Sequence, residues 1–480
     1  MSLAILFAVA LAAPAAQAGA GLALRGGACD AAAIAFAAIG AIAAFAAIGA
    51  YSTGERSVLV LAAPLADLTL AFRAEPLGLT MLALTAGLNA LASLYAASYR
   101  HARREPVSVR MAAFSGLALA CAGAAMTAAN LFAFFVAYVG LALAAFPVVA
   151  EAAPKAARMQ LAWMLGPAVV CFLPAAVWTS TLAPGAAFTV GGILPPDVEP
   201  WIIDALIVLF AIGLAGAGTM PAHRWQIEAA EAPTPVALIL QVLAIAPIGA
   251  IGFLKIAVGV FGAPALAQAG AGKLVLAAAL ACVAIAPLIA LGRPTLSERL
   301  VYSTLAANAF AVAAAALGAQ TAVLGAALQL IAHGLGKTAL LMSAGSIETA
   351  TGRRDVAAIG GVGQRMPWTF AALSIGAFSL AGLAPAAGAW PLVWTVAGAG
   401  SVAAWAAVII FAGSAFATFA LLAPAALRGF AQPAEVNPFS RPDGAPLGLI
   451  APTAFAAVAT LGLVAFIDPI ARFVITGLIP

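Results

Sequence analysis

Long apolar runs separated by short polar segments repeat along the whole chain. Each run is close to the roughly 20 residues that an α-helix needs to cross the hydrocarbon core of a bilayer. The pattern predicts an all-α polytopic membrane protein with about 14 transmembrane helices, at approximately 2–24, 31–51, 77–99, 110–128, 130–150, 158–182, 202–220, 234–260, 271–292, 297–318, 320–345, 367–388, 401–427 and 445–467.

The basic residues between the runs test this assignment, because Lys and Arg concentrate in cytoplasmic loops. With the N-terminus outside, the outer segments hold four of them, Arg56, Arg73, Lys273 and Arg472. The inner segments hold fifteen: Arg25, Arg100, Arg103, Arg104, Arg110, Lys155, Arg158, Arg224, Arg293, Arg299, Arg353, Arg354, Arg365, Arg428 and Arg441. We therefore predict a multi-pass protein of a bacterial-type inner membrane with its N-terminus outside.

The first run ends in Ala-Pro-Ala-Ala-Gln-Ala, which is similar to a signal-peptide cleavage site. A signal peptide begins with a basic region, and this run does not. We therefore predict a retained helix.

Composition excludes several classes of protein. Only 8% of the 480 residues are charged and 65% are hydrophobic, whereas soluble domains are about 25% charged. The net charge of +4 follows the inner loops, so it does not indicate nucleic-acid binding. The four cysteines are scattered and form no CxxC pair, so neither a disulfide framework nor a metal site is predicted. No cofactor is predicted either.

Two of the predicted helices contain breaks, Gly216–Pro221 in the seventh and Gly382–Gly388 in the twelfth. At membrane depth, such breaks survive only where protein or an internal cavity covers the freed backbone groups. Matched broken helices in two halves indicate an internal repeat with an ion or substrate path in each half. Two packing kinks would give the same spacing. The repeat would divide the chain into N-terminal helices (1–109), two five-helix repeats (110–262 and 263–430) and a C-terminal helix with its tail (431–480).

Four segments carry a family resemblance: Asn130–Tyr138, Pro221–Val236, His333–Ile347, and Gly360–Gly361 with Arg365–Pro367 and the break before Trp390. With them the chain resembles the antiporter-like membrane subunits shared by respiratory complex I, membrane-bound hydrogenases and Mrp-type cation/proton antiporters. The Mrp D-type and hydrogenase branch is the most similar. The resemblance implies two inverted five-helix repeats with helices seven and twelve broken. It also implies related membrane subunits and lipid as partners, and H⁺ or Na⁺ as the transported ion.

In that family, buried ionisable side chains carry protons through each half. Where the family has Glu, Lys, Lys, His and a cation, this chain has Val139, Gly216, Pro247, Gln329 and Leu392. We therefore predict no ionisable side chain linking helices five, seven and eight at mid-membrane. The remaining proton-path candidates are His333, Lys337, Lys255, Glu228, Glu231 and His223.

A charge at mid-bilayer costs about 2.5–3.5 kcal/mol on insertion scales. We therefore expect Lys337 and His333 to face the protein interior. Packing or hydrogen bonding around the break is an alternative role for both. Glu228, Glu231 and Arg224 are expected to form ion pairs in a loop at the inner end of helix eight, with an entry path as the alternative. Near helix ends, Asp67, Glu75 and Asp204 are expected to be interfacial anchors.

Three functions remain. The chain is a structural subunit of a larger membrane complex, a proton or cation transporter that uses its second half, or a stand-alone transporter of a small solute. The scarcity of polar midplane residues argues against the third. The first is favoured because Val139, Gly216 and Pro247 cannot relay protons, although water can replace a missing side chain. No redox chemistry of its own is predicted, and a non-redox place in an oxidoreductase-like or hydrogenase-like complex stays open.

Overall fold

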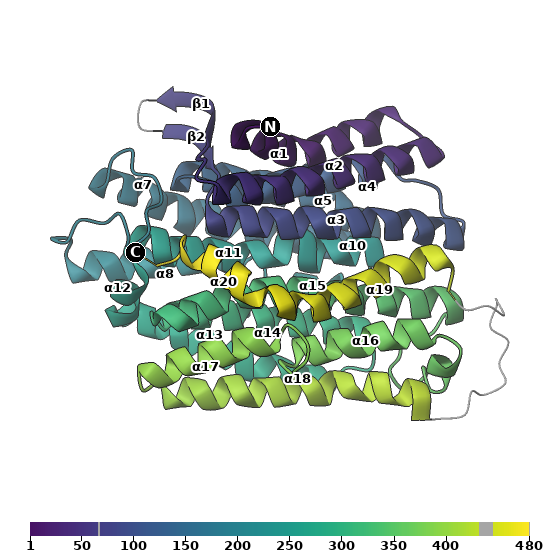
Figure 1. Ribbon diagram of the computed structural model, residues 1–480. Helices are drawn as coiled ribbons and strands as arrows, with labels where there is room; N and C mark the ends of the chain where they lie inside the picture. The colour runs from purple at the N-terminus through teal and green to yellow at the C-terminus, as the bar shows by residue number, and fades with distance from the viewer. Residues whose placement is uncertain (66–67, 432–444, 480) are drawn as a thin grey trace.

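The computed structural model describes residues 1–65, 68–431 and 445–479, and its long helices run side by side along one common direction (Figure 1). Among the described residues, 12 helices are long and apolar enough to cross a membrane, and two shorter apolar helices, Pro200–Ala215 and Pro367–Leu380, accompany them. The shorter two are the predicted broken helices seven and twelve. The chain is a polytopic, multi-pass integral membrane protein of about 12–14 apolar helices, as the hydropathy pattern predicted.

The N-terminal part consists of α1 (Leu3–Ala23), α2 (Gly26–Ser52), α3 (Pro76–Arg103) and α4 (Val109–Thr127). A hairpin of two antiparallel strands, β1 (Val58–Leu65) and β2 (Leu68–Arg73), lies between α2 and α3 at one end of the helix bundle (Figure 1). The sequence prediction missed this hairpin. Its apolar run is too short to span a bilayer, so hydropathy alone treats it as a loop.

The next part of the chain contains the first break. Its elements are α5 (Leu131–Ala152), α6 (Pro154–Pro167), the π-helix η1 (Ala168–Phe172), α7 (Leu173–Leu182), α8 (Pro200–Ala215), α9 (Arg224–Glu228), α10 (Thr234–Leu238), the π-helix η2 (Ile239–Leu243), α11 (Ile245–Ile256), the π-helix η3 (Ala257–Phe261) and α12 (Ala263–Gln268). The predicted sixth helix starts four residues earlier than expected, at Pro154, because Pro is favoured in the first turn of a helix.

The last part contains the second break. Its elements are α13 (Gly270–Leu291), α14 (Leu296–Ala316), α15 (Gln320–Thr351), the 3₁₀-helix η4 (Val362–Gln364), α16 (Pro367–Leu380), α17 (Ala389–Ser401), α18 (Trp405–Ala431), α19 (Leu447–Gly462), the 3₁₀-helix η5 (Leu463–Phe466) and α20 (Ile467–Ile475).

The predicted bounds of the twelfth and thirteenth helices were wrong. The twelfth does not end at 388: it consists of α16 and α17 and reaches Ser401, so the thirteenth, α18, begins at Trp405. Because the break interrupts the helix, α16 alone is too short to span a bilayer, and α17 supplies the remaining length.

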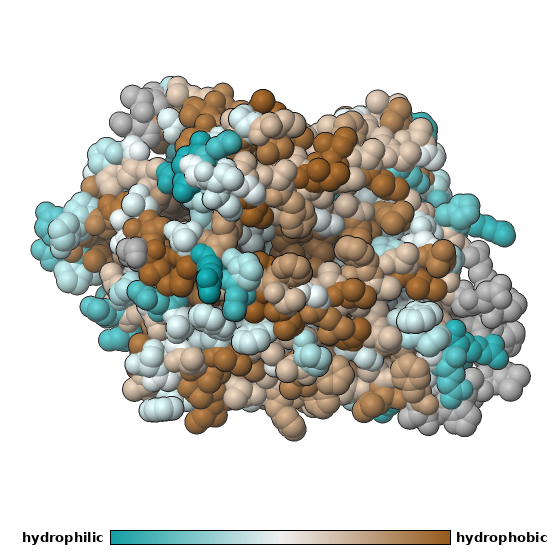
Figure 2. Space-filling view, in the orientation of Figure 1, coloured by the Kyte–Doolittle hydropathy of each residue, from teal (hydrophilic) through white to brown (hydrophobic). Residues whose placement is uncertain are grey.

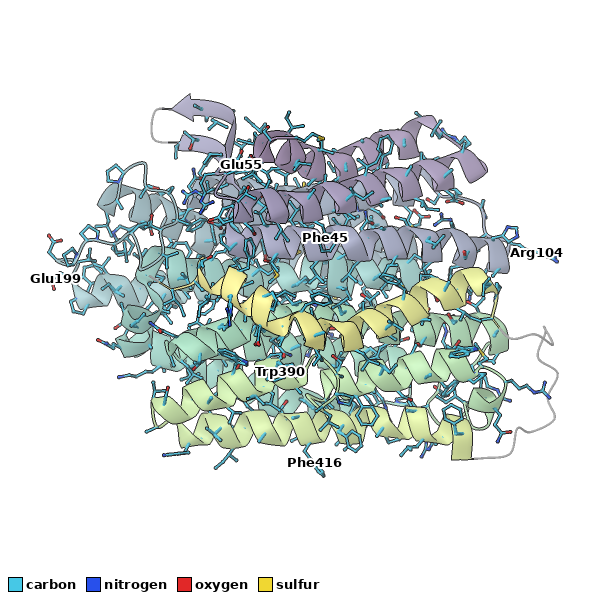
Figure 3. The ribbon with its side chains drawn as sticks, in the orientation of Figure 1. Phe45, Glu55, Arg104, Glu199, Trp390 and Phe416 are labelled. Atoms are coloured by element: carbon cyan, nitrogen blue, oxygen red, sulfur yellow. The ribbon has the colours of Figure 1, made fainter. Side chains whose placement is uncertain are left out.

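The surface of the bundle matches a lipid environment. Figure 2 shows apolar residues over the middle of the molecule, with polar residues gathered toward its two ends. Phe416 is 75% exposed and points away from α18 (Figure 3). Arg104 and Glu199 lie at opposite ends (Figure 3). Much of the buried core is alanine, which allows helices to approach closely where lipid removes the hydrophobic drive between them.

Ion pairs at the Arg104 end join segments that the charge pattern placed on the inner side. Arg103 pairs with Glu348 at 3.4 Å, and a second pair joins Arg100 to Asp30. The predicted loop ion pairs are confirmed: Lys155–Glu228 at 2.8 Å, Arg224–Glu228 at 4.0 Å and Arg354–Glu231 at 3.7 Å. Arg441 and Asp67, two residues used in the predictions, lie outside the described residues.

Candidate functional site: two broken helices and two buried lysines

The first break follows the end of α8 at Ala215 and is covered by protein side chains. The carbonyl of Gly216 accepts a hydrogen bond from Trp225 Nε1 at 3.1 Å. The carbonyl of Ala217 accepts one from Gln226 Nε2 at 3.0 Å. Both donors are buried residues of the short helix α9. Side chains therefore satisfy two of the carbonyls at the break.

Asn308 on α14 completes this cover. Its Nδ2 donates to the carbonyl of Gly218 at 3.2 Å and to the carbonyl of Ala246 at 2.8 Å. Gly218 belongs to the first break, and Ala246 precedes Pro247 in α11, the predicted eighth helix. The side-chain amide of Asn308 therefore connects the broken helix, helix eight and α14 of the second half. Asn308 was not among the predicted site residues. A lone Asn in an Ala-rich membrane helix is the signal that would have found it, because polar side chains there bond across helices.

Gly216 leaves no room for a side chain. A Cβ atom on this residue would overlap the carbonyl of Trp163 and lie 3.0 Å from the amide nitrogen of Met164. Helix α6 therefore passes against the backbone of α8 at the position where the resemblance implies a Lys. Val139 and Pro247, the two neighbouring replaced positions, are half-buried. The hydroxyl of Tyr138, beside Val139, is buried without a partner among the described residues.

Lys255 near the end of α11 is buried and paired. Its Nζ forms an ion pair with the carboxylate of Glu75 and donates to the carbonyl of Met126 at 3.1 Å. The ring of Phe188 lies 5.3 Å from the same nitrogen. Glu75, predicted as an interfacial anchor at a helix end, also supplies the counter-charge of a buried Lys 180 positions away, a role that was not predicted. Asp204 accepts a hydrogen bond from the amide of Ala271 at 2.7 Å, in the first turn of α13.

The second buried Lys has a different environment. Lys337 on α15 is fully buried and His333, one turn earlier, is 7% exposed, as the insertion argument predicted. Lys337 Nζ donates to the carbonyl of Leu300 and to Ser303 Oγ at 2.8 Å. On the next residue of α14, Thr304 Oγ1 donates to Gln241 Oε1 at 3.3 Å. Among the described residues, no Asp or Glu is buried, so Lys337 faces neutral oxygens only.

A small cavity adjoins this cluster and the second break. It has room of about 30 Å³ for water, which suits one or two molecules. Its lining includes Ser303, which binds Lys337, and Gly382 and Gly388 of the second break. It also includes Gln329, His333, Leu392, Ser414 and Thr418. His333 Nε2 has no hydrogen-bond partner among the described residues. The cavity thus brings His333 together with Gln329 and Leu392, two positions where the resemblance implies ionisable residues.

The second break is covered mainly by backbone groups, whereas the first is covered by side chains. Gly382 adopts a left-handed conformation with φ of +69°, which a residue without Cβ takes without strain. The amide of Ala387 donates to the carbonyl of Thr460 on α19 at 3.3 Å. Ser379 Oγ, at the end of α16, is buried without a partner among the described residues.

The other predicted candidates lie between α8 and α10, in the segment that the charge pattern assigns to the inner side. His223 Nδ1 is 3.1 Å from the carbonyl of Pro221, so it closes the loop of the first break on itself. Glu228 and Glu231 form the ion pairs described above. A hydrogen bond from Lys155 holds the pKa of Glu228 below its usual range. None of these three lines the cavity beside His333.

Comparison with known proteins decides the family. A sequence profile described as the transmembrane region of NADH:quinone oxidoreductase and Mrp antiporter subunits matches residues 128–418, more than half of the chain. The chain belongs to this family. The matched region begins at the end of α4 and includes both breaks and both buried lysines.

Relatives within the NADH:quinone oxidoreductase/Mrp antiporter family come from several kinds of complex. NADH-quinone oxidoreductase subunit N of Desulforudis audaxviator is 28% identical over 391 residues, which are 77% of this chain and 75% of that protein. Hydrogenase-4 component B of Escherichia coli is 30% identical over 205 residues, 39% of this chain and 30% of that protein. The chain therefore spans most of the first relative and less than a third of the second.

Solved structures of family complexes have the same fold. A chain of the Mrp complex from Dietzia sp. DQ12-45-1b superposes with a TM-score of 0.83 at 22% identity, over 99% of this chain and 51% of that chain. A chain of respiratory complex I from Thermus thermophilus gives 0.80 at 19% identity, over 98% and 97%. These likenesses concern the fold, and the family's membrane subunits are found in multisubunit complexes.

Proposed function

We propose that this chain is an antiporter-like subunit of a multisubunit proton- or cation-translocating complex, with a structural role and a degraded proton path, and that its first half serves assembly and no longer conducts protons. The observation that carries the proposal is the packing of Gly216 against the backbone of Trp163. A relay residue cannot be accommodated there, and the break beside it is satisfied by Trp225 and Gln226. The partners are related membrane subunits and lipid, in a bacterial-type inner membrane with the N-terminus outside.

The division of the chain follows from the same proposal. Helices four to eight (110–262) and nine to thirteen (263–430) form two repeats of inverted orientation, each with one broken helix. The N-terminal helices (1–109) and the last helix with its tail (431–480) flank them. Matched breaks after α8 and α16 support this division, because paired broken helices are typical of repeats built around a midplane site.

A second candidate function rests on the cavity beside His333. Lys337 and His333 provide groups that can bind and release protons, Ser303 is hydrogen-bonded to Lys337, and about 30 Å³ of space lined by Ser303 and His333 suits water. In this alternative, the second half transports H⁺, or exchanges it for Na⁺, although Gln329 and Leu392 replace two ionisable residues of the family pattern.

Proton flux through the whole complex in sealed vesicles, with assembly measured on native gels, separates the two functions. Lys337→Met keeps the length of the side chain and removes its amine. The structural function predicts that this variant assembles and that flux through the complex is unchanged. Loss of flux in a normally assembled Lys337→Met complex would establish the transporter function in its place.

Val139→Glu tests the closed first half directly, with Val139→Gln as a neutral control of similar size. An unpaired carboxylate at this depth lacks a compensating charge. We expect the Glu variant to misassemble and the Gln variant to assemble better. If Val139→Glu assembled normally and raised proton flux, the first half would hold a latent path, and the proposed structural function would be wrong.

A further inference from the structure

A polar cavity lies among the N-terminal helices, apart from both broken helices. It has a volume of about 80 Å³, and α1, α2, α3, α4 and the α10–η2 segment contribute to its wall. Its polar lining residues are Gln17, Cys29, Asp30, Asn89, Ser93, Arg100, Ser108 and Ser115. At its inner end, Asp30 and Arg100 form an ion pair and are each about one-fifth exposed. The cavity therefore opens toward the inner side past a charged pair.

The deeper groups are buried and only partly satisfied by one another. Asn89 Nδ2 donates to Gln17 Oε1 at 3.0 Å, and Gln17 Nε2 lies 3.5 Å from Ser93 Oγ. Ser115 Oγ, on a residue 8% exposed, and Arg100 Nε have no partner among the described residues. Unsatisfied polar groups are costly inside a membrane protein. The lining therefore points to a small hydrogen-bonding guest, and the volume suits several water molecules.

The polar groups on α3 continue toward the middle of the bundle. Ser93, Asn89 and Thr85 are spaced four residues apart, so they lie along one face of the helix. A second cavity, of about 20 Å³, shares Asn89 with the first and reaches Thr85 and Leu82. Thr85 Oγ1 lies 3.6 Å from the sulfur of Met126, whose carbonyl binds Lys255. The line of polar groups thus runs from Asp30–Arg100 to the Lys255–Glu75 pair.

We propose that this cavity, together with the smaller one that shares Asn89 with it, is an inward-open vestibule that takes up water from the inner aqueous phase as far as Thr85. Leu82 and Met126 close it off from Lys255 and Glu75. Neutral amides and hydroxyls both donate and accept hydrogen bonds, which fits water as the guest. The proposal goes beyond the proposed function and does not rest on it, because the vestibule involves neither broken helix.

Two native cysteines provide a matched test within one molecule. Cys29 is 2% exposed and lines the vestibule, whereas Cys282 is 6% exposed and lines an apolar cavity beside α13. Sealed vesicles of known orientation, holding the intact complex, are treated at mildly alkaline pH with a charged methanethiosulfonate. Labelling of the two cysteine peptides is then followed by mass spectrometry. From the inner side, we expect Cys29 to react roughly tenfold faster than Cys282, because a charged reagent in water can reach a thiol that lines a hydrated vestibule but not one that lines an apolar cavity.

The structure predicts that Ser115→Val, which fills the vestibule and removes a hydroxyl, slows the labelling of Cys29 and leaves that of Cys282 unchanged. Equal rates for the two cysteines, or labelling of Cys29 only by a lipid-soluble maleimide, would overturn the vestibule. Protection of Cys29 by Na⁺ but not by choline would show a metal-cation site and overturn the assignment to water. Because the rates are read on the native chain, the test does not depend on the variant folding.

Discussion

The two halves of the molecule each contain a broken helix and a buried Lys, but the partners of the Lys and the contacts at the break differ between the halves. In the first half, Lys255 has the carboxylate of Glu75, and the break at Gly216 is covered by three side chains. In the second half, Lys337 has only the carbonyl of Leu300 and the hydroxyl of Ser303. A cavity reaches from there to the second break.

The difference between the two buried lysines lies in their partners, a carboxylate for Lys255 and neutral oxygens for Lys337. A carrier needs a hydrated route and a group whose charge is not fixed by a permanent partner. Lys255 is held by a counter-charge and lies in the last turn of α11, so its ion pair is expected to stabilise the fold. Lys337 has a neutral shell, and the cavity with room for water is lined by its partner Ser303 and by His333, which is the arrangement that supports the second candidate function.

The largest effect in this comparison is expected at the Lys255–Glu75 pair. Glu75→Gln leaves the ammonium of Lys255 buried without its counter-charge. Breaking a fully buried pair typically destabilises by about 3–5 kcal/mol, and we expect somewhat less because Glu75 is 21% exposed. Thermal unfolding of the detergent-solubilised complex measures the loss. Lys255→Met combined with Glu75→Gln should recover much of it, and a double variant no better than the single would show that the pair is not coupled.

Sequence alone could predict the helices and the breaks because their causes are local. Fourteen apolar runs follow from the length needed to span a bilayer, and both breaks follow from Gly and Pro in those runs. The partnership of Glu75 with Lys255 could not be predicted. The two residues are 180 positions apart, and a single sequence carries periodicity but no record of distant contacts.

The candidate site was only partly predictable for the same reason. Burial of Lys337 and His333 follows from the cost of a charge in lipid, so it needed no knowledge of the fold. The donors that cover the first break, Trp225, Gln226 and Asn308, come from two separate segments. These tertiary contacts decide which groups bind the backbone of a break, and the sequence of the break itself does not reveal them.

The second prediction concerns the close packing at the first break. Gly216→Ala places a Cβ atom against the carbonyl of Trp163, so α6 and α8 must separate. Overpacking typically destabilises by about 1–3 kcal/mol and occasionally by more. We expect lower yield of assembled complex and a lower unfolding temperature. Gly166→Ala is the matched control, because no heavy atom lies within 4 Å of a Cβ there. Equal stability of the two variants would mean that α6 does not seal α8.

The third prediction compares polar side chains at the two breaks. Asn308→Leu removes the donor shared by the carbonyls of Gly218 and Ala246, and each unsatisfied buried group typically costs about 1–3 kcal/mol. Ser379→Ala at the second break removes a hydroxyl that has no partner among the described residues, so it should be nearly neutral. Unfolding temperatures of the two variants give the comparison. A larger decrease in unfolding temperature for Ser379→Ala than for Asn308→Leu would contradict the expected difference between the two breaks.

The smallest effect is expected from acid at the inner end of the first half. The hydrogen bond from Lys155 lowers the pKa of Glu228 in the folded protein, so the folded state favours the carboxylate more than the unfolded state does. This contribution is fully present above the unfolded pKa of about 4.3 and is lost as pH falls through the lower, folded pKa. Lys155→Gln should therefore flatten the acid side of the curve of unfolding temperature against pH, while Lys155→Arg should preserve it. Since the pair is exposed and screened, the change should be far smaller than that from Asn308→Leu. An unchanged acid limb in Lys155→Gln would show that other carboxylates set the acid sensitivity of this region.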